Sequence, residues 1–379
     1  MAYSSLSSLI SYQSVKLPAT IMLKSLYKYF IPLLMSLVLV IPVKSQATGS
    51  GADLQQISSD RIWAQTLTGS HFNEFWNYQF YFDNGMTAHI VFSAANFGSL
   101  KSPVTGVRVS VYDPDKDRVF QVTREYPIEY LVQDRENYLF KLRPGRDIYF
   151  EGKLPEEHRV VVKFSKDGVS YDIDLKLNDI VQGFTLGDSK FRVADESIGI
   201  VTHIPYAKVS GHITINNNRK QVEGTAYMDH THQHQTTTRL MHSGYRFVHH
   251  ADNENWDILY FLLPSSSNNQ SAVGYSLRSE NGNVKLMEVD RISYTSDGKA
   301  FGKTFPRIVE VKLADQSNLR IARTNDIERF SLLGELGRIA RRAARTFLGG
   351  EVIDFRGEGT LMESSQRPKH GDYNFFFVE

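Results

Sequence analysis

Ionisable side chains are concentrated in the stretch YMDHTHQHQ, residues 227 to 235. Asp229, His230, His232 and His234 fall within these nine positions, and eight of the twelve histidines in the chain lie between residues 203 and 250. Carboxylate and imidazole groups at this density can bind a metal ion, transfer protons, or form a buried hydrogen-bonded patch. The surrounding sequence bears on all three interpretations.

A metal site requires the histidines to converge. Side chains two apart in a strand point to the same face, so His230 and His232 share one face while Tyr227 and Asp229 share the other. Such a histidine pair can hold one ion if a neighbouring strand supplies a third ligand. His250 follows in the next strand-like segment, and the alternative metal set is therefore His230, His232 and His250.

An acid–base site requires a proton donor in a dry pocket. Hydration or cyclisation of an alkene begins with protonation at carbon, and a carboxyl group among apolar side chains has a raised pKa that lets it hold a proton near neutrality. Asp229 or His230 would be the donor. Aromatic faces stabilise cationic charge, and Tyr227, Tyr260 and Trp256 are expected to form the walls.

The third interpretation is structural. Asp229 would then fix His230 or cap a backbone turn, while His232 and His234 face solvent. The same residue can serve as clamp and as catalyst, so the sequence alone leaves all three interpretations open.

Composition excludes several classes of function. The chain has 379 residues, enough for two ordinary domains or one large one, and its 41% hydrophobic and 12% aromatic side chains can fill a sizeable core. Its net charge of +1 provides no general attraction for nucleic acid. It contains no cysteine, which excludes disulfides, thiol nucleophiles and cysteine–zinc sites.

The N-terminal region is typical of an export signal. Three lysines precede an apolar run at residues 29–43, which is short for a membrane span, and Ser45 and Ala47 supply the small residues of a cleavage site. We expect a signal peptide at residues 1–47 and a periplasmic or secreted mature chain. An uncleaved, membrane-associated anchor is the alternative.

Beyond a small, polar and flexible lead-in expected at residues 48–60, the pattern is that of an all-β protein. Segments such as TAHIVFSA and SYDIDLKL alternate apolar and polar residues, and turn pairs such as Asn84-Gly85 and Asp167-Gly168 separate them. The alternation breaks near residue 200. We therefore expect an N-terminal antiparallel barrel at residues 61–203 and a C-terminal one at residues 204–379, each of lipocalin size.

One helix is expected at residues 331–348, inserted before the last strands. Its sequence is amphipathic. The apolar positions are Leu332, Leu336, Ile339, Ala343 and Phe347, and the basic positions are Arg338, Arg341, Arg342 and Arg345. We expect the apolar face to pack against the barrel with the arginines in solvent. The alternative is a helix that makes peripheral contact with a membrane surface.

Two segments resemble the lipocalin-like family of AttH-type proteins and carotenoid hydratases (hydroxyneurosporene synthase). The first is IPYAKVSGHITINNNRKQVEGTAYMDH, in which Pro205, Gly211, Gly224 and the Tyr227–His230 stretch match the opening of the family's second barrel. The second is the segment at residues 73–99, which carries Glu74 and Trp76 before a turn glycine. The resemblance implies two tandem lipocalin-like β-barrels, but it does not fix an activity.

The chain departs from the family at two positions. His232 stands where the family usually has tryptophan, and Leu262 stands where hydratase members are expected to have an acid two residues after a tyrosine matched by Tyr260. Both differences weaken a carotenoid hydratase assignment in particular.

Together these observations predict a cofactor-independent, acid-catalysed hydratase or cyclase for a hydrophobic, isoprenoid or polyketide-like substrate. The alternatives are an exported lipid-binding carrier without catalysis and a histidine-ligated metalloprotein. The predicted catalytic residues are Asp229, His230, Tyr227 and Tyr260, and the predicted ligand-binding residues are Glu74, Trp76, His232 and Trp256.

Overall fold

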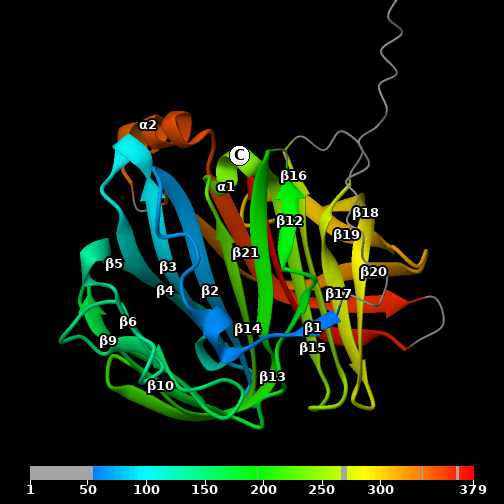
Figure 1. Cartoon of the computed structure of the whole chain (residues 1–379), viewed down its shortest axis with the longest axis horizontal. Coiled ribbons are helices and arrows are strands. Elements are labelled where there is room, and N and C mark those ends of the chain that lie inside the picture. The colour runs from blue at the N-terminus through cyan, green and yellow to red at the C-terminus, as the bar shows by residue number, and fades with distance from the viewer. Residues whose placement is uncertain (1–53, 194, 266–270, 332, 335, 364–366) are drawn as a thin grey trace, which may run out of the picture. The chain divides into compact units, whose positions relative to one another are not determined.

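A large open sheet and a closed barrel, both antiparallel, make up the fold (Figure 1). The computed structural model describes residues 54–379 except 194, 266–270, 332, 335 and 364–366. The expected signal peptide lies outside the described residues. All described residues belong to one compact unit of the chain.

The open sheet has 14 strands. Its main path runs, in spatial order, through β5 (Arg118–Pro127), β4 (Val104–Asp113), β3 (Thr87–Phe97), β2 (His71–Phe82), β14 (Asn218–Gln233), β13 (Glu196–Ile215), β10 (Val169–Asn178), β9 (His158–Lys166), β8 (Ile148–Glu151), β7 (Leu139–Lys141) and β6 (Val132–Asp134). β1 (Leu54–Gln56) pairs with β11 (Phe184–Leu186), and β11 and β12 (Lys190–Val193) both pair with β13.

The closed barrel has strands β15 (Met241–His250), β16 (Trp256–Pro264), β17 (Val273–Glu280), β18 (Asn283–Ala300), β19 (Lys303–Leu313), β20 (Asn318–Ser331), β21 (Val352–Glu363) and β22 (Lys369–Val378). The helices are α1 (Thr237–Leu240) and α2 (Arg338–Leu348), with single 3-10 turns η1 (Ser59–Ile62), η2 (Gly98–Leu100), η3 (Pro114–Lys116) and η4 (Ile128–Tyr130). No helix in the described part of the chain is long and apolar enough to cross a membrane.

Three apolar cores hold these elements together. One fills the concave side of the open sheet around Trp76 and Phe150, and a second fills the barrel around Phe305 and Phe355. The third joins the two, because side chains of β11–β14 pack there against side chains of β15–β17. The all-β fold of two lipocalin-like halves is confirmed, with the N-terminal half an open curled sheet and the C-terminal half a closed barrel.

A glycine allows the central strands to approach closely. Gly224 of β14 lies opposite Phe82 of β2, and a Cβ atom at this position would lie 2.1 Å from the carbonyl oxygen of Tyr81. Any side chain there would push β14 away from β2. This close approach gives a physical reason for the glycine three residues before Tyr227.

The division of the chain differs from the expected one. Residues 204–233 belong to the open sheet, and the barrel begins at Met241, so the boundary expected after His203 falls within β13. The alternation breaks there because residues 198–207 of β13 are buried on both faces and the pairing with β14 is irregular after Thr202. Within the lead-in, residues 54–56 form a paired strand.

The helix is also shorter than expected. It begins at Arg338, since Ser331 ends β20 and Gly337 is the N-cap, and it ends as expected at Gly349, whose φ of 79° is left-handed. The predicted packing of its apolar face is wrong. Ala344 and Leu348 are buried, whereas Ile339 is 88% exposed.

Candidate functional site

Strand alternation sends the residues of the 227–235 stretch to two different environments. As predicted, His230 and His232 lie on one face of β14 and Asp229 on the other. His230 stacks on Trp76 inside the open sheet, with ring centroids 4.6 Å apart, whereas Asp229 contacts Arg246 of the barrel. Both Asp229 and His230 are fully buried. The two residues therefore cannot act together on one substrate.

On the inner face of the open sheet, Glu74 is the centre of a hydrogen-bonded cluster. Its carboxylate accepts bonds from the Gln65 amide (2.7 Å), from the amide and hydroxyl of Thr66 (3.1 and 2.9 Å) and from His230 Nε2 (2.7 Å). Burial by itself would raise the pKa of Glu74, but the bond and charge of His230 and the Gln65 amide hold that pKa below its usual value.

The other two histidines of this cluster are aromatic neighbours of His230. The centroids of His203 and His232 lie 5.7 and 5.5 Å from that of the His230 ring. Burial, followed by the nearby charge of His230, lowers the pKa of His232 to about 4, and burial lowers that of His203 well below its usual value. Both rings are neutral at physiological pH. On this face of β14 the side chains form a buried polar patch, but Glu74 and not Asp229 fixes His230. The expected exposure of His232 is wrong because its ring is buried beside His230, whereas His234 is exposed as expected.

The alternative metal set is not assembled. His250 has other hydrogen-bond partners. Its Nδ1 lies 2.9 Å from the Thr225 hydroxyl, and its Nε2 lies 2.8 Å from the Pro205 carbonyl oxygen. Across residues 54–379, within the described positions, no group of three or more His, Cys, Asp or Glu side chains is placed to hold a metal ion. The ligand set His230, His232 and His250 was wrong because the strand pairing directs His250 away from the other two.

On the outer face of β14, Asp229 is part of a second polar cluster. Asn77 Nδ2 donates to Oδ1 at 2.9 Å, and Arg246 Nε lies 2.7 Å from Oδ2 in an ion pair between two buried side chains. Burial raises the pKa of Asp229 above its usual value even though the Arg246 charge and the Asn77 bond act in the opposite direction.

A chain of hydroxyl groups leads from Asp229 to Tyr260. The Thr231 hydroxyl donates to Asp229 Oδ1 at 3.4 Å and lies 3.0 Å from the Tyr260 hydroxyl. The guanidinium of Arg246 lies 4.6 Å from the centre of the Tyr260 ring. Burial raises the pKa of Tyr260, although the Arg246 charge opposes the shift. We call Asp229, Thr231 and Tyr260 the relay.

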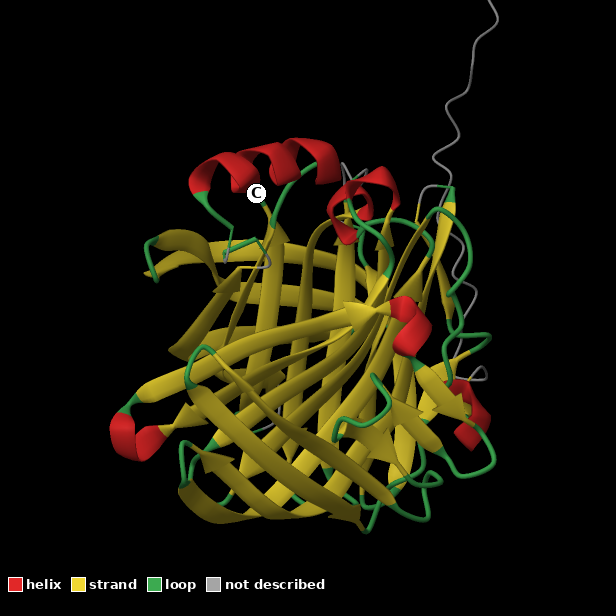
Figure 2. Cartoon of the chain, turned by 90° about the vertical axis from the view of Figure 1, so that its left-hand side faces the viewer, coloured by secondary structure: helices red, strands yellow, loops and turns green. Residues whose placement is uncertain are grey.

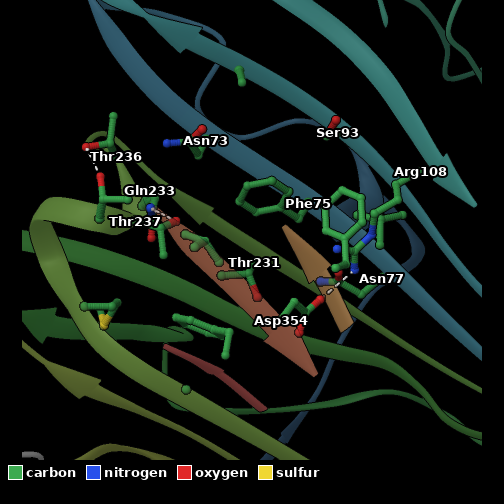
Figure 3. A pocket seen from close by; sticks show the side chains of 18 of the residues that line it. Asn73, Phe75, Asn77, Ser93, Arg108, Thr231, Gln233, Thr236, Thr237 and Asp354 are labelled. Atoms are coloured by element: carbon green, nitrogen blue, oxygen red, sulfur yellow. Dashed lines mark hydrogen bonds and ion pairs between the residues drawn. The ribbon is translucent and has the colours of Figure 1, made fainter. Parts of the chain in front are cut away.

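The relay ends at a cavity of about 230 Å³ between the open sheet and the barrel. Thr231 and Tyr260 line this cavity, and Asp229 lies behind them. Figure 3 shows Asn77, Arg108 and Asp354 at one end and Thr236 and Thr237 at the other. Apolar walls include Phe75, Val91, Phe97, Val107, Met241, Leu262, Phe330, Leu348 and Phe376. The cavity thus has extended apolar walls with polar side chains among them, and Arg108 and Asp354 form a charged pair at one end.

Three residues at the charged end were missed by the sequence analysis. Arg108 Nη2 pairs with Asp354 Oδ2 at 2.9 Å and donates to His89 Nδ1 at 3.1 Å. Burial and the surrounding arginine charges lower the pKa of His89 well below its usual value. Because Nδ1 accepts a bond, the proton of the neutral ring is on Nε2, which has no partner among the described residues. His89 therefore lines the cavity with an unpaired buried donor.

The predicted site residues divide as follows. Tyr260 lines the cavity, and Asp229 reaches it through Thr231. Glu74, Trp76, His230 and His232 are on the opposite face of the sheet, whereas Tyr227 and Trp256 are in the core between sheet and barrel. The available signal for His89 was its position as the one ionisable residue in the run TAHIV, on the same face as Val91.

We expect the free energy of unfolding of the Glu74→Gln variant to depend less on acidic pH than that of the wild type. The pKa of Glu74 is lower in the folded chain than its ordinary value of 4.5, so its contribution is complete above that value and is lost as pH falls through the folded pKa. The variant should be less stable at neutral pH by about 1–3 kcal/mol, and its stability should fall less steeply with acid. Urea unfolding across this pH range measures both effects. An unchanged acid slope, with the exposed Glu125→Gln variant as control, would contradict this role.

Comparison with known proteins supports the fold. No protein-family model and no curated protein matches the sequence. A candidate AttH protein (NE1406) from Nitrosomonas europaea has a similar structure, with a TM-score of 0.61, 14% identity, and coverage of 86% of this chain and 98% of the other. The structure of CghA with Sch210972 is also similar, with a TM-score of 0.58, 13% identity, and coverage of 86% of this chain and 98% of the other.

Kievitone hydratase from Nectria haematococca matches more weakly, with a TM-score of 0.49, 11% identity, and coverage of 86% of this chain and 96% of the other. No conclusion rests on this weaker similarity. The first two define the class: this chain has the tandem lipocalin-like fold of AttH-type proteins, as the sequence motifs indicated. At these identities the likeness concerns fold only.

Proposed function

We propose that this protein is a cofactor-independent hydratase or cyclase that acts on a hydrophobic substrate in the cavity between sheet and barrel. The relay is the observation that carries the proposal. It connects a buried carboxyl group of raised pKa, through one hydroxyl, to a tyrosine that lines a cavity with both apolar and polar walls. Sites that combine apolar walls with a few convergent polar groups are typical of small-molecule binding.

The relay can present a proton to the substrate. A threonine hydroxyl has one hydrogen, so while Asp229 is ionised Thr231 donates to it and accepts from Tyr260. Protonation of Asp229 reverses both bonds and leaves the Tyr260 hydrogen free to point into the cavity. In a hydration, the proton given by Tyr260 is replaced through Thr231 from Asp229. The proton released by the attacking water returns along the same path.

The charges around Tyr260 restrict the substrate. The guanidinium groups of the buried Arg246 and the half-buried Arg108 oppose a bare carbocation nearby, but they favour negative charge on an oxygen atom. We therefore infer a substrate with a carbonyl or hydroxyl oxygen at the charged end of the cavity, conjugated to the alkene that reacts. This chemistry fits a polyketide-like compound better than a plain isoprenoid hydrocarbon. In a cyclisation, Tyr260 would only need to donate to that oxygen while the new bond forms.

Incubation with a panel of conjugated polyene ketones, followed by chromatography and mass spectrometry, tests the proposal. Hydration adds the mass of one water, and cyclisation gives a product of unchanged mass and altered retention. We expect one of these products to form without added metal or cofactor. The absence of turnover with a compound that binds in the cavity would contradict catalysis.

A second candidate function is lipid carriage without catalysis. It is favoured by the pairing of the charges that line the cavity, since Arg108 pairs with Asp354 and Arg246 with Asp229. Native mass spectrometry of the gently purified chain separates the two functions. A bound compound that stays unchanged over time supports a carrier, and one that is converted supports an enzyme.

A further inference from the structure

Helix α2 is attached to the protein by its basic face. Glu351, which is fully buried, accepts bonds from Arg341 Nε at 2.9 Å and Nη2 at 2.8 Å, and Arg345 lies 3.8 Å from both Glu351 and Glu379. Arg341, Ala344, Arg345 and Leu348 follow one another at helical spacing and define the inward face. The position of one buried carboxylate thus determines which side of the helix faces inward.

The apolar face of the helix consequently points outward. It consists of Leu336, just before the helix, and Ile339, Ala340, Ala343 and Phe347, all exposed. Ile339 is 88%, Leu336 42% and Phe347 37% exposed, and these three are among the few large hydrophobic side chains that are exposed in the described chain. A solvated helix normally has the opposite orientation, so this face calls for a partner.

Two arginines border this apolar stripe. Arg338 and Arg342 are exposed, and neither forms an ion pair with any described residue. They lie one turn apart beside Ile339, where long basic side chains can reach the phosphate groups of a lipid surface while the apolar side chains insert below. Acidic groups that contact the helix, Glu351 and Glu379, are already engaged by Arg341 and Arg345.

The helix stands at one end of the cavity. Leu348 packs with Phe97 of β3 in a small cluster, and both side chains line the cavity. Figures 1 and 2 show α2 at the same end of the molecule as α1, whose residues Thr237 and Thr238 also line it. A surface that received α2 would therefore face this end of the cavity.

We propose that α2 docks onto an anionic lipid bilayer, with Leu336, Ile339 and Phe347 inserted and Arg338 and Arg342 on the lipid phosphates. Because Arg338 and Arg342 are positively charged, a negatively charged partner is favoured. The size of the patch selects a bilayer over a second copy of the chain, because one short helix offers less than the roughly 800 Å² per partner of a stable protein interface. An interfacial helix needs only shallow insertion. The proposal is independent of any catalytic activity.

Tryptophan fluorescence can report on this helix alone. The three native tryptophans are Trp63, Trp76 and Trp256, each at most 1% exposed, so an Ile339→Trp substitution in the full chain adds the only exposed indole of the described residues. With vesicles of phosphatidylglycerol and phosphatidylcholine, we expect its emission to shift to the blue and to be quenched by brominated lipid. The readout at residue 339 also separates docking by α2 from any membrane contact of the N-terminal region.

Two comparisons make the test specific. Adding Arg338→Glu and Arg342→Glu to this variant should weaken its response to anionic vesicles about thirtyfold or more, given the usual contribution of each basic residue near such a surface. A Phe301→Trp variant, altered at a hydrophobic side chain that is 44% exposed on the β18–β19 hairpin, should not respond. An unshifted emission at residue 339, or a shift that arises only from concentration-dependent dimerisation in sedimentation velocity, would overturn the proposal.

Discussion

Replacing Arg246 by methionine is expected to destabilise the fold by about 3–5 kcal/mol. The substitution leaves the Asp229 carboxylate fully buried without its counter-charge, and its remaining polar contacts are with the neutral side chains of Asn77, Thr231 and Tyr227. It also removes the bond that Arg246 Nη1 donates to Asn374 at 3.1 Å. Urea unfolding followed by circular dichroism gives the change in the free energy of unfolding.

The double variant Asp229→Asn/Arg246→Met provides the decisive control. Neither charge of this buried pair remains in it, so most of the lost stability should return. Lys101→Met breaks the exposed pair with Glu125 and should cost no more than about 1 kcal/mol. If the double variant is as unstable as Arg246→Met alone, packing of the arginine side chain and not the ion pair accounts for the effect.

The strands and the separation of Asp229 from His230 could be predicted from the sequence because both follow from the two-residue period of a strand. That period is local, and it holds wherever one face is buried. It failed in β13, where residues 198–207 are buried on both faces and the alternation disappears. The expected domain boundary was placed at this failure of the pattern and not at an end of a sheet.

The polar residues of the cavity could not be found in this way. His89 and Arg108 come from the neighbouring strands β3 and β4 of the sheet, and Arg246 and Asp354 come from β15 and β21 of the barrel. The two pairs are distant in sequence. Only the packing of the sheet on the barrel brings them together. The histidine-rich stretch stands out by its density, but His230 and His232 belong to the interior of the sheet and His234 is exposed.

The helix illustrates the same limit. Amphipathicity is visible in the sequence, but it does not state which face lies inward. For α2 the orientation depends on Glu351, a buried carboxylate beyond the end of the helix whose charge requires cationic partners. The arginines that were expected to be solvated, Arg341 and Arg345, are the ones that hold the helix in place.

Removal of the Tyr260 hydroxyl is expected to have the largest effect on activity. In the Tyr260→Phe variant we expect kcat/KM to fall about 10²–10⁴-fold, the usual contribution of a positioned acid, with little change in stability. The ring, its packing in the core and its contact with Arg246 are retained, and only the end of the relay is lost. Product formation on the compound identified in the substrate panel is the measurement.

The pH profile distinguishes the relay from a merely structural role of these residues. Donation by Tyr260 requires protonated Asp229, so activity should decline as pH rises through the raised pKa of that carboxyl group. Asp229→Asn should abolish this decline together with most of the activity, because an amide cannot resupply the proton. His230→Gln alters a buried residue of the same strand on the opposite face and should retain the wild-type pH profile in whatever fraction folds. If His230→Gln removes the pH dependence and Asp229→Asn does not, the reacting groups lie on the inner face of the open sheet and the relay plays no part in the chemistry.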